Sequence, residues 1–178
     1  MIESNATFEV RLVDCAKDTT PPDSPSEYSD WGPIDSRSAN PDMERWLIVV
    51  ADVADDGHDG HDGHDGGQVT VGDLTAMPTW FGPTTGSLAV SIGIALVPQY
   101  RGRGIGTTAQ RLLAELLHNR GIVRVQASTD VTNIAEQRAL AKAGFTFEGV
   151  MRGAQVRASG RHDLQVWSHL RGDGWFDD

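Results

Sequence analysis

A glycine-rich basic segment between a predicted strand and a predicted helix constrains this chain more than any other feature. An apolar run over residues 87–97 ends at Pro98. Three glycines follow on alternate positions, Gly102, Gly104 and Gly106, and a helical pattern begins at once. Alternate glycines allow a tight turn and leave its N–H groups uncovered. At the start of a helix those groups and the helix dipole attract anions. The segment therefore predicts a phosphate or pyrophosphate site.

Two familiar phosphate-binding loops do not fit this spacing. A P-loop ends in Gly-Lys-Ser/Thr, whereas Gly106 is followed directly by Thr107. A dinucleotide-binding loop needs a wider glycine spacing and an acidic residue about twenty positions later, where this chain has Arg124. The pattern that fits is Arg/Gln-x-x-Gly-x-Gly/Ala, matched by Arg101, Gly104 and Gly106. It resembles the coenzyme A loop of the GNAT superfamily of N-acetyltransferases.

Residues downstream of the loop extend this resemblance. The segment Asn133–Phe145 is similar to the second GNAT signature, a helix that starts at an asparagine and closes on Gly-Phe. Residues 147–152 and 161–164 resemble the last strands of one branch, whose members acetylate the N-terminal alanine or serine of ribosomal proteins. The resemblance covers residues 86–170, about half of the chain, with the motifs in the expected order.

Hydrophobic periodicity predicts one α+β domain over residues 1–178, a length that can bury a core. Strands are expected at residues 8–13, 46–51, 68–76, 87–97, 122–127, 145–157 and 162–170, and helices at 107–120 and 133–144. The proline-rich stretch after the first strand predicts turns and at most short helical pieces. These elements indicate a mixed, mostly antiparallel sheet with helices on its faces. The resemblance implies that the two strands flanking the first helix splay apart to admit the pantetheine arm of coenzyme A.

Composition narrows the class of protein. A net charge of −10 argues against a general nucleic-acid or membrane binder and would attract a cationic amine. The single cysteine, Cys15, cannot form an internal disulfide, which favours the cytoplasm, and no apolar run approaches the roughly 18 residues of a membrane span. The first five residues lack the layout of a signal peptide. Trp80 and Phe81, beside a Gly-Pro turn, are expected to pack in the core or to contact a second copy in a homodimer, and the alternative is that they line a ligand pocket.

The resemblance implies acetyl-coenzyme A as co-substrate and a reaction that requires no metal. Residues 101–107 would hold the pyrophosphate, the strand before them the pantetheine, and Asn133 the region near the thiol. The main-chain N–H of Ile94 or Leu96 would stabilise the developing oxyanion. The coenzyme-binding set is thus Leu96, Val97, Arg101, Gly102, Arg103, Gly104, Ile105, Gly106, Thr107 and Asn133.

The residues that serve as general acid and general base in the family are not present at the matching positions of this chain. Leu140 stands where many members have a tyrosine, Glu136 where the ribosomal-protein branch has a serine, and Gln155 where that branch has a glutamate. An amine acceptor must still lose a proton. Four candidates remain for this step: Glu136, Asp130, Glu148 and His162. Each also has a structural explanation, because Glu136 could only cap its helix, Glu148 could only pair with Arg152, and His162 could be a satisfied buried histidine.

Three functions of different classes are consistent with the sequence. The first is an N-acetyltransferase that acts on a primary amine, either a protein N-terminus or a small molecule. The second is a non-catalytic acyl-coenzyme A sensor, favoured by the missing tyrosine and serine. The third is a metal-binding module built on the Gly-His-Asp triplet repeat of residues 57–66. Glycine at every third position favours a flexible hairpin insertion over a preorganised metal site.

The repeat is predicted to be dispensable, because its composition cannot bury apolar surface to offset the entropy of ordering. Replacing residues 57–66 with a short Gly-Ser turn should leave the melting temperature and the activity almost unchanged. Thermal unfolding and a coenzyme A release assay would check this. A drop of several degrees, a loss of turnover, or tight metal uptake that the replacement abolishes would contradict it.

Overall fold

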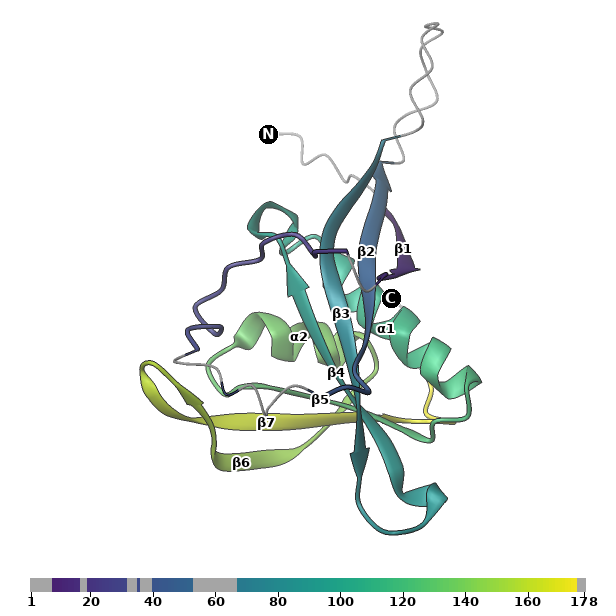
Figure 1. Ribbon diagram of the computed structural model, residues 1–178, viewed down its shortest axis with the longest axis vertical. Coiled ribbons are helices and arrows are strands. Elements are labelled where there is room, and N and C mark those ends of the chain that lie inside the picture. Colours follow the sequence, from purple (N-terminus) through teal and green to yellow (C-terminus); the bar gives the residue numbers. More distant parts are fainter. Residues whose placement is uncertain (1–7, 17–18, 32–34, 36–39, 53–66, 176–178) are drawn as a thin grey trace, which may run out of the picture.

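The computed structural model describes residues 8–16, 19–31, 35, 40–52 and 67–175 (Figure 1). The repeat of residues 57–66 lies outside these ranges. The described residues form one seven-stranded sheet in the order β1-β2-β3-β4-β5-β7-β6, with two α-helices packed on it. The strands are β1 (Phe8–Asp14), β2 (Glu44–Asp52), β3 (Gln68–Trp80), β4 (Leu88–Leu96), β5 (Arg124–Asp130), β6 (Thr146–Arg157) and β7 (Gly160–Leu170). The helices are α1 (Ile105–Asn119) and α2 (Ile134–Lys142).

The core lies between the sheet and α1. Ala109, Leu113 and Leu117, spaced four residues apart on one face of the helix, are each at most 3% exposed. They join buried side chains of the central strands such as Leu74 and Val125. The helix packs on β1, β3, β4 and β5, while α2 packs on β5 and β6. This packing fixes the start of α1, and so the glycine loop, against the end of β4.

The centre of the sheet splits into two arms. β4 and β5 form the one parallel pair among the described strands, and their pairing ends at Ile92 and Ala127. β4 continues to Leu96 on β3, and β5 continues to Asp130 on β7. The two strands therefore diverge, with β4 pointing up and β5 running sideways in Figure 1. The splay expected from the family resemblance is confirmed.

The sequence placed the elements well and their ends less well. All seven strands and both helices occur where periodicity predicted them, but β3 runs on to Trp80. In the described residues 19–31 and 40–43 there is no helix, as the prolines predicted. Trp80 and Phe81 are 57% and 65% exposed, so the expectation that they pack in the core is wrong. Among the described residues no helix is long and apolar enough to cross a bilayer.

Candidate active site

The loop between β4 and α1 exposes the main-chain donors that the sequence predicted. Gly102 and Gly104 have φ angles of 72° and 79°, in the left-handed region that favours glycine. Gly104 is the N-cap of α1, so the N–H groups of the first turn have no partner within the helix. A Cβ added at either glycine would meet nothing within 4 Å. The loop therefore offers bare donors and open space to an anion.

The third glycine serves packing. A Cβ on Gly106 would lie 3.4 Å from Leu96 Cδ1 and 3.6 Å from Ile94 Cδ1. Glycine at this position lets the first turn of α1 approach β4 closely. Ile105 and Val97, both predicted to bind coenzyme, are buried on either side of the loop, so only their main chain can reach a ligand.

The free edge of β4 faces the gap between the arms. Val97 N–H donates to Val71 O at 2.9 Å on β3, and the oxygen of Ala95 lies close to Gly72 on the same strand. Backbone groups of successive strand residues point to opposite sides, so those of Ile94 and Leu96 face β5. β5 is no longer paired with β4 at this level. Ile94 and Leu96 are the residues that the sequence predicted for oxyanion stabilisation.

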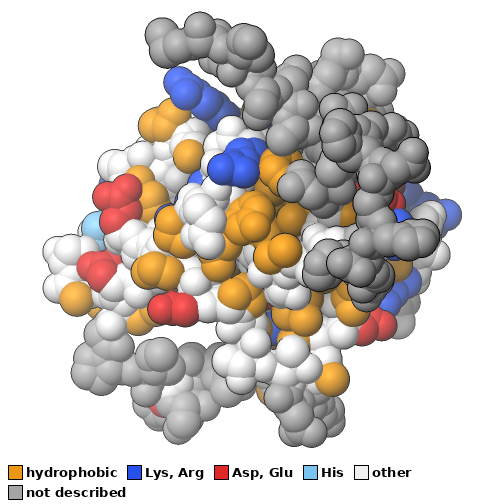
Figure 2. Space-filling model, turned by 90° about the horizontal axis from the view of Figure 1, so that it is seen from above, with side chains coloured by type: hydrophobic (Ala, Val, Ile, Leu, Met, Phe, Trp, Pro, Cys, Tyr) orange, Lys and Arg blue, Asp and Glu red, His pale blue; other side chains and the backbone are white. Residues whose placement is uncertain are grey.

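The two arginines of the loop have different partners. The Arg101 guanidinium donates to three main-chain carbonyls: Leu96 O at 2.8 Å, Pro25 O at 2.6 Å and Ser24 O at 3.5 Å. The Arg103 guanidinium lies 5.7 Å from the Phe8 ring centroid and 5.6 Å from that of Tyr100. Both side chains are exposed. Seen from above in Figure 2, the end to which β4 points carries basic side chains beside a hydrophobic patch.

Glu136 lies in the first turn of α2. Asn133 caps this helix, because its Oδ1 accepts the Glu136 N–H at 3.3 Å. The cap thus uses the main chain of Glu136, and its carboxylate faces the buried Gln110 of α1. Burial raises the pKa of the Glu136 carboxyl to about 7, and the hydrogen bond of Gln110 opposes that rise. Glu136 can therefore take and release a proton near neutral pH.

Asp130 and His162 are brought together at the tip of β5. Asp130 is an ion-pair partner of the buried Arg157, and its other oxygen accepts from Thr132 N–H at 2.8 Å. Burial acts to raise the pKa of Asp130, but the Thr132 hydrogen bonds and the charges of Arg157 and His162 lower it overall. His162 Nδ1 lies 3.1 Å from Asp130 Oδ2, and its Nε2 is 2.9 Å from Ser159 Oγ. Asp130 therefore stays ionised. Both ring nitrogens of His162 have a partner, Asp130 on one side and Ser159 on the other.

Glu148 is at the other end of the sheet. Its carboxylate accepts from both terminal nitrogens of Arg124, at 2.6 and 2.5 Å, and from Ser168 Oγ at 2.7 Å. The Arg124 hydrogen bonds lower the pKa of Glu148 to about 2. Its partner is Arg124, so the alternative pairing with Arg152 is wrong. Arg124 and Asp130 are the first and last residues of β5, so the carboxylate of Glu148 is bound away from the open end of the sheet, where β4 and β5 diverge.

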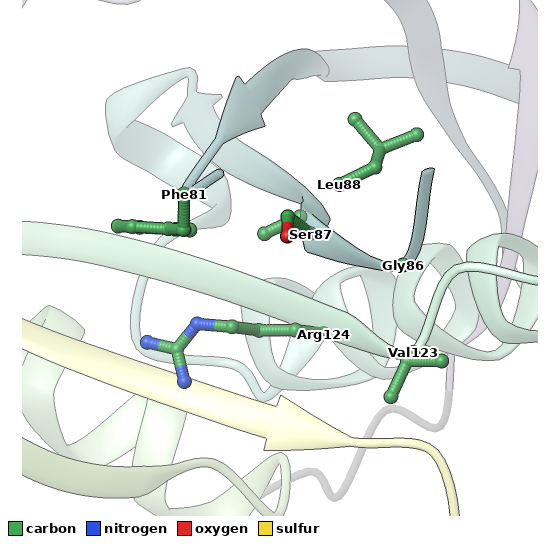
Figure 3. A pocket seen from close by; sticks show the side chains of 7 residues that line it. Phe81, Gly86, Ser87, Leu88, Val123 and Arg124 are labelled. Carbon is green, nitrogen blue, oxygen red and sulfur yellow. The ribbon is translucent and has the colours of Figure 1, made fainter. Parts of the chain in front are cut away.

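A shallow cavity of about 310 Å³ lies beside Arg124, at the closed end of the sheet, where β4 and β5 are still paired (Figure 3). Phe81, Val123 and the start of β4 line it, and Phe81 stands 5.8 Å from the Arg124 guanidinium. The coenzyme loop follows the opposite end of β4, so this cavity is separate from the glycine site. Among the described residues no three His, Cys, Asp or Glu side chains are grouped to hold a metal.

Sequence comparison decides the family. Residues 9–146 match the family model described as an acetyltransferase (GNAT) domain, which covers more than half of the chain. The chain belongs to the GNAT acetyltransferase family. No curated protein sequence matches it significantly.

Solved structures share this GNAT fold. RimL, a ribosomal-protein α-N-acetyltransferase in complex with coenzyme A, is 21% identical with a TM-score of 0.54, over 74% of this chain and 64% of its own. A probable GNAT acetyltransferase from Chromobacterium violaceum is 23% identical, with a TM-score of 0.59 and coverages of 83% and 71%. A ribosomal-protein-alanine N-acetyltransferase from Brucella melitensis is 20% identical, with a TM-score of 0.52 and coverages of 70% and 68%. The chain thus spans less than two thirds of RimL.

Sequence reasoning missed three contributors to this GNAT site. Gln110 looked like an ordinary residue of the amphipathic helix, yet it is 1% exposed and faces Glu136. Arg157 lies in a predicted strand, and only its 5% exposure marks it as an anchor. The contact of Arg101 with Pro25 joins segments 76 residues apart, which no local pattern could indicate.

The raised pKa of Glu136 predicts how stability depends on pH. A carboxyl whose folded pKa lies above its ordinary 4.5 contributes stability below pH 4.5 and loses it as pH rises through about 7. Glu136→Gln cannot ionise, so its melting temperature should rise relative to wild type between pH 5 and pH 8. Thermal unfolding at several pH values measures this difference.

Glu148→Gln is the matched control. The lowered pKa of Glu148 gives stability that is present above pH 4.5 and lost as pH falls through about 2. Its variant should be less stable than wild type by a constant margin from pH 5 to pH 8. A Glu136→Gln difference that is equally flat would show that Glu136 has an ordinary pKa.

Proposed function

We propose that this chain is an acetyl-coenzyme A-dependent N-acetyltransferase that acts on a primary amine. The observation that carries the proposal is the gap between β4 and β5, with the unpaired edge of β4 on one side and the bare donors of the glycine loop at its end. A long thioester with a pyrophosphate at one end needs both features: an extended edge to pair with and an anion site beyond it.

Different residues of the site bind different parts of the coenzyme. Main-chain N–H groups of residues 102–107 and the Arg103 cation hold the pyrophosphate. The Leu96 and Val97 segment provides the strand edge for the pantetheine amides. The Ile94 or Leu96 N–H donates to the thioester carbonyl, where negative charge develops as the amine attacks. Asn133, the cap of α2 in the turn after β5, is proposed to lie near the thiol, as the family resemblance implies.

Glu136 is the proposed base. Its pKa of about 7 allows it to accept a proton from the acceptor ammonium, directly or through one water. Asp130 and Glu148 have lowered pKa values, and each is paired with an arginine, so neither is suited to this step. The fourth candidate, His162, is already held between Asp130 and Ser159. The attacking nitrogen forms the amide bond while the C–S bond breaks. The thiolate leaves as an anion, since a free thiol has a pKa near 8.5 and needs little help from an acid. The second proton that the nitrogen loses as the amide forms then passes to the departed thiolate or to solvent.

The acceptor is proposed as a class only. A protein N-terminus is supported by the names of RimL and the Brucella enzyme, which act on ribosomal proteins. A small amine fits the same chemistry, and the net charge of −10 favours a cationic acceptor of either kind. The single cysteine supports a cytoplasmic setting.

One observation favours a second function, a non-catalytic acyl-coenzyme A sensor. Leu140, at the position of the family's tyrosine acid, is 0% exposed in the core. A sensor would bind the coenzyme without turnover. Release of free coenzyme A in the presence of a broad amine library therefore separates the two functions, and binding without release would favour the sensor.

The coenzyme site predicts a charge effect at Gly104. Gly104→Asp places a carboxylate where the pyrophosphate approaches, and binding of coenzyme A should weaken at least about tenfold. Gly104→Asn is the matched control, because asparagine has the same shape, tolerates the left-handed backbone equally and has no charge. Calorimetry that finds equal affinities for the two variants would refute a pyrophosphate contact at this residue.

The base assignment predicts a catalytic effect at Glu136. Glu136→Gln keeps the size of the side chain and the main-chain cap, so coenzyme binding should persist while kcat falls about a hundredfold or more. Coenzyme A release with the best acceptor of the amine screen measures this. If the variant keeps more than half of the wild-type kcat from pH 6 to pH 9, deprotonation rests with solvent or another residue.

A further inference from the structure

Residues 24–30, here called the strap, connect the two arms of the split sheet. One end of the strap is tied to the hairpin that joins β6 and β7. Asp30 O accepts Ala158 N–H at 2.8 Å, and Asp30 Oδ2 accepts Ser159 Oγ–H at 2.8 Å. This hairpin belongs to the arm that contains β5, because β7 is the partner of β5.

Two further contacts hold the strap on this arm. The OH of Tyr28 donates to Thr132 O at 3.3 Å, in the turn after β5. The guanidinium of Arg157 lies 5.7 Å from the Tyr28 ring centroid and donates to Glu27 O at 3.5 Å. Arg157 is buried and paired with Asp130. The strap is thus firmly anchored from Glu27 to Asp30.

The other end of the strap depends on Arg101. Its Nη2 donates to Pro25 O at 2.6 Å and to Ser24 O at 3.5 Å, while its Nε donates to Leu96 O at 2.8 Å. Arg101 directly follows β4 and begins the glycine loop. The strap therefore crosses the open end of the split sheet, from the tip of β4 to the β6–β7 hairpin, as its path in Figure 1 shows.

The hydrogen-bond acceptors of Arg101 in this structure are weaker than a phosphate would be. All three are neutral carbonyls, and the contacts are exposed to solvent. A guanidinium binds a phosphate more strongly, through short charge-assisted hydrogen bonds. The Leu96 carbonyl is also on the β4 edge that the pantetheine amides would use. A bound coenzyme would thus compete with Arg101 at Leu96 and attract its guanidinium at the pyrophosphate.

We propose that Arg101 is a latch that couples the coenzyme site to the acceptor side. In the coenzyme-free chain it holds the strap over the open end of the sheet. When coenzyme binds, the guanidinium turns to the pyrophosphate, Ser24 and Pro25 are released, and the strap swings out on its anchor at Glu27–Asp30. The acceptor amine then reaches the thioester. This inference rests on the proposed function, since it needs coenzyme in the glycine loop.

Limited proteolysis before Asp23 with an aspartate-specific protease, followed by mass spectrometry, measures release of the Ser24–Pro25 end of the strap. Cleavage of a segment that opens and closes quickly follows the population of its open form. Without coenzyme, Arg101→Gln should speed cleavage before Asp23 at least about fivefold over wild type. The control Arg103→Gln removes the neighbouring cation, which touches aromatic rings and not the strap, and should stay within about twofold.

Addition of free coenzyme A, without any acceptor, is the second part of the experiment. Saturation, established by calorimetry, should speed cleavage of wild type to the level of Arg101→Gln and leave that variant unchanged. Equal cleavage of wild type and Arg101→Gln without coenzyme would overturn the latch. So would wild-type cleavage that is unchanged or slowed by bound coenzyme A. If wild type binds no coenzyme A, the proposed function fails, and the transfer of Arg101 to a pyrophosphate fails with it.

Discussion

The early end of the parallel pairing between β4 and β5 is the constraint on which the rest of the site depends. Their ladder stops at Ile92 and Ala127, yet neither strand ends there, because β3 supports β4 to Leu96 and β7 supports β5 to Asp130. One pair before this last level, Gln126 Nε2 donates to Ser91 Oγ at 2.9 Å, which ties the arms together. Beyond the last pair, backbone groups of β4 face a gap where β5 no longer pairs with them, and the Leu96 carbonyl there accepts from Arg101 instead.

The chemistry follows from what surrounds that gap. The glycine loop follows the tip of one arm, and the cap of α2 follows the tip of the other. Helix α1 starts at that loop and contacts Glu136 through Gln110, so an anion site, a free strand edge and the carboxylate of Glu136 share one region. The helices determine the proton chemistry, since packing of α2 beside α1 desolvates Glu136 against Gln110. Arg157 has the opposite effect on Asp130, whose charge it compensates. Burial acts to raise the pKa of both carboxyls, so it is their partners that separate them. Glu136 lies beside a neutral amide and can be neutralised, whereas Asp130 is paired with Arg157 and stays an anion.

Local signals could be predicted from the sequence, and long-range pairings could not. The glycine loop, the Asn133 cap and the amphipathic face of α1 each depend on residues within a few positions, and the structure confirms all three. The splay came from family resemblance, because no pattern within a strand reveals where its neighbour departs. Arg101 was predicted to hold the pyrophosphate, and no local pattern indicated that its guanidinium also binds a proline-rich segment 76 residues away. Glu148 looked like a partner of Arg152, but the sheet order brings Arg124 to it from β5.

Amide hydrogen exchange along β4 tests the central claim most directly. If the gap holds coenzyme, saturating coenzyme A will slow exchange of the Ile94 and Leu96 amides, which face the gap. The amides of Gly93 and Ala95 face β3 and should change little on the same addition. Protection confined to Ile94 and Leu96 is the predicted result. Coenzyme A that binds by calorimetry yet leaves these two amides unprotected would show that the unpaired edge of β4 is not its site.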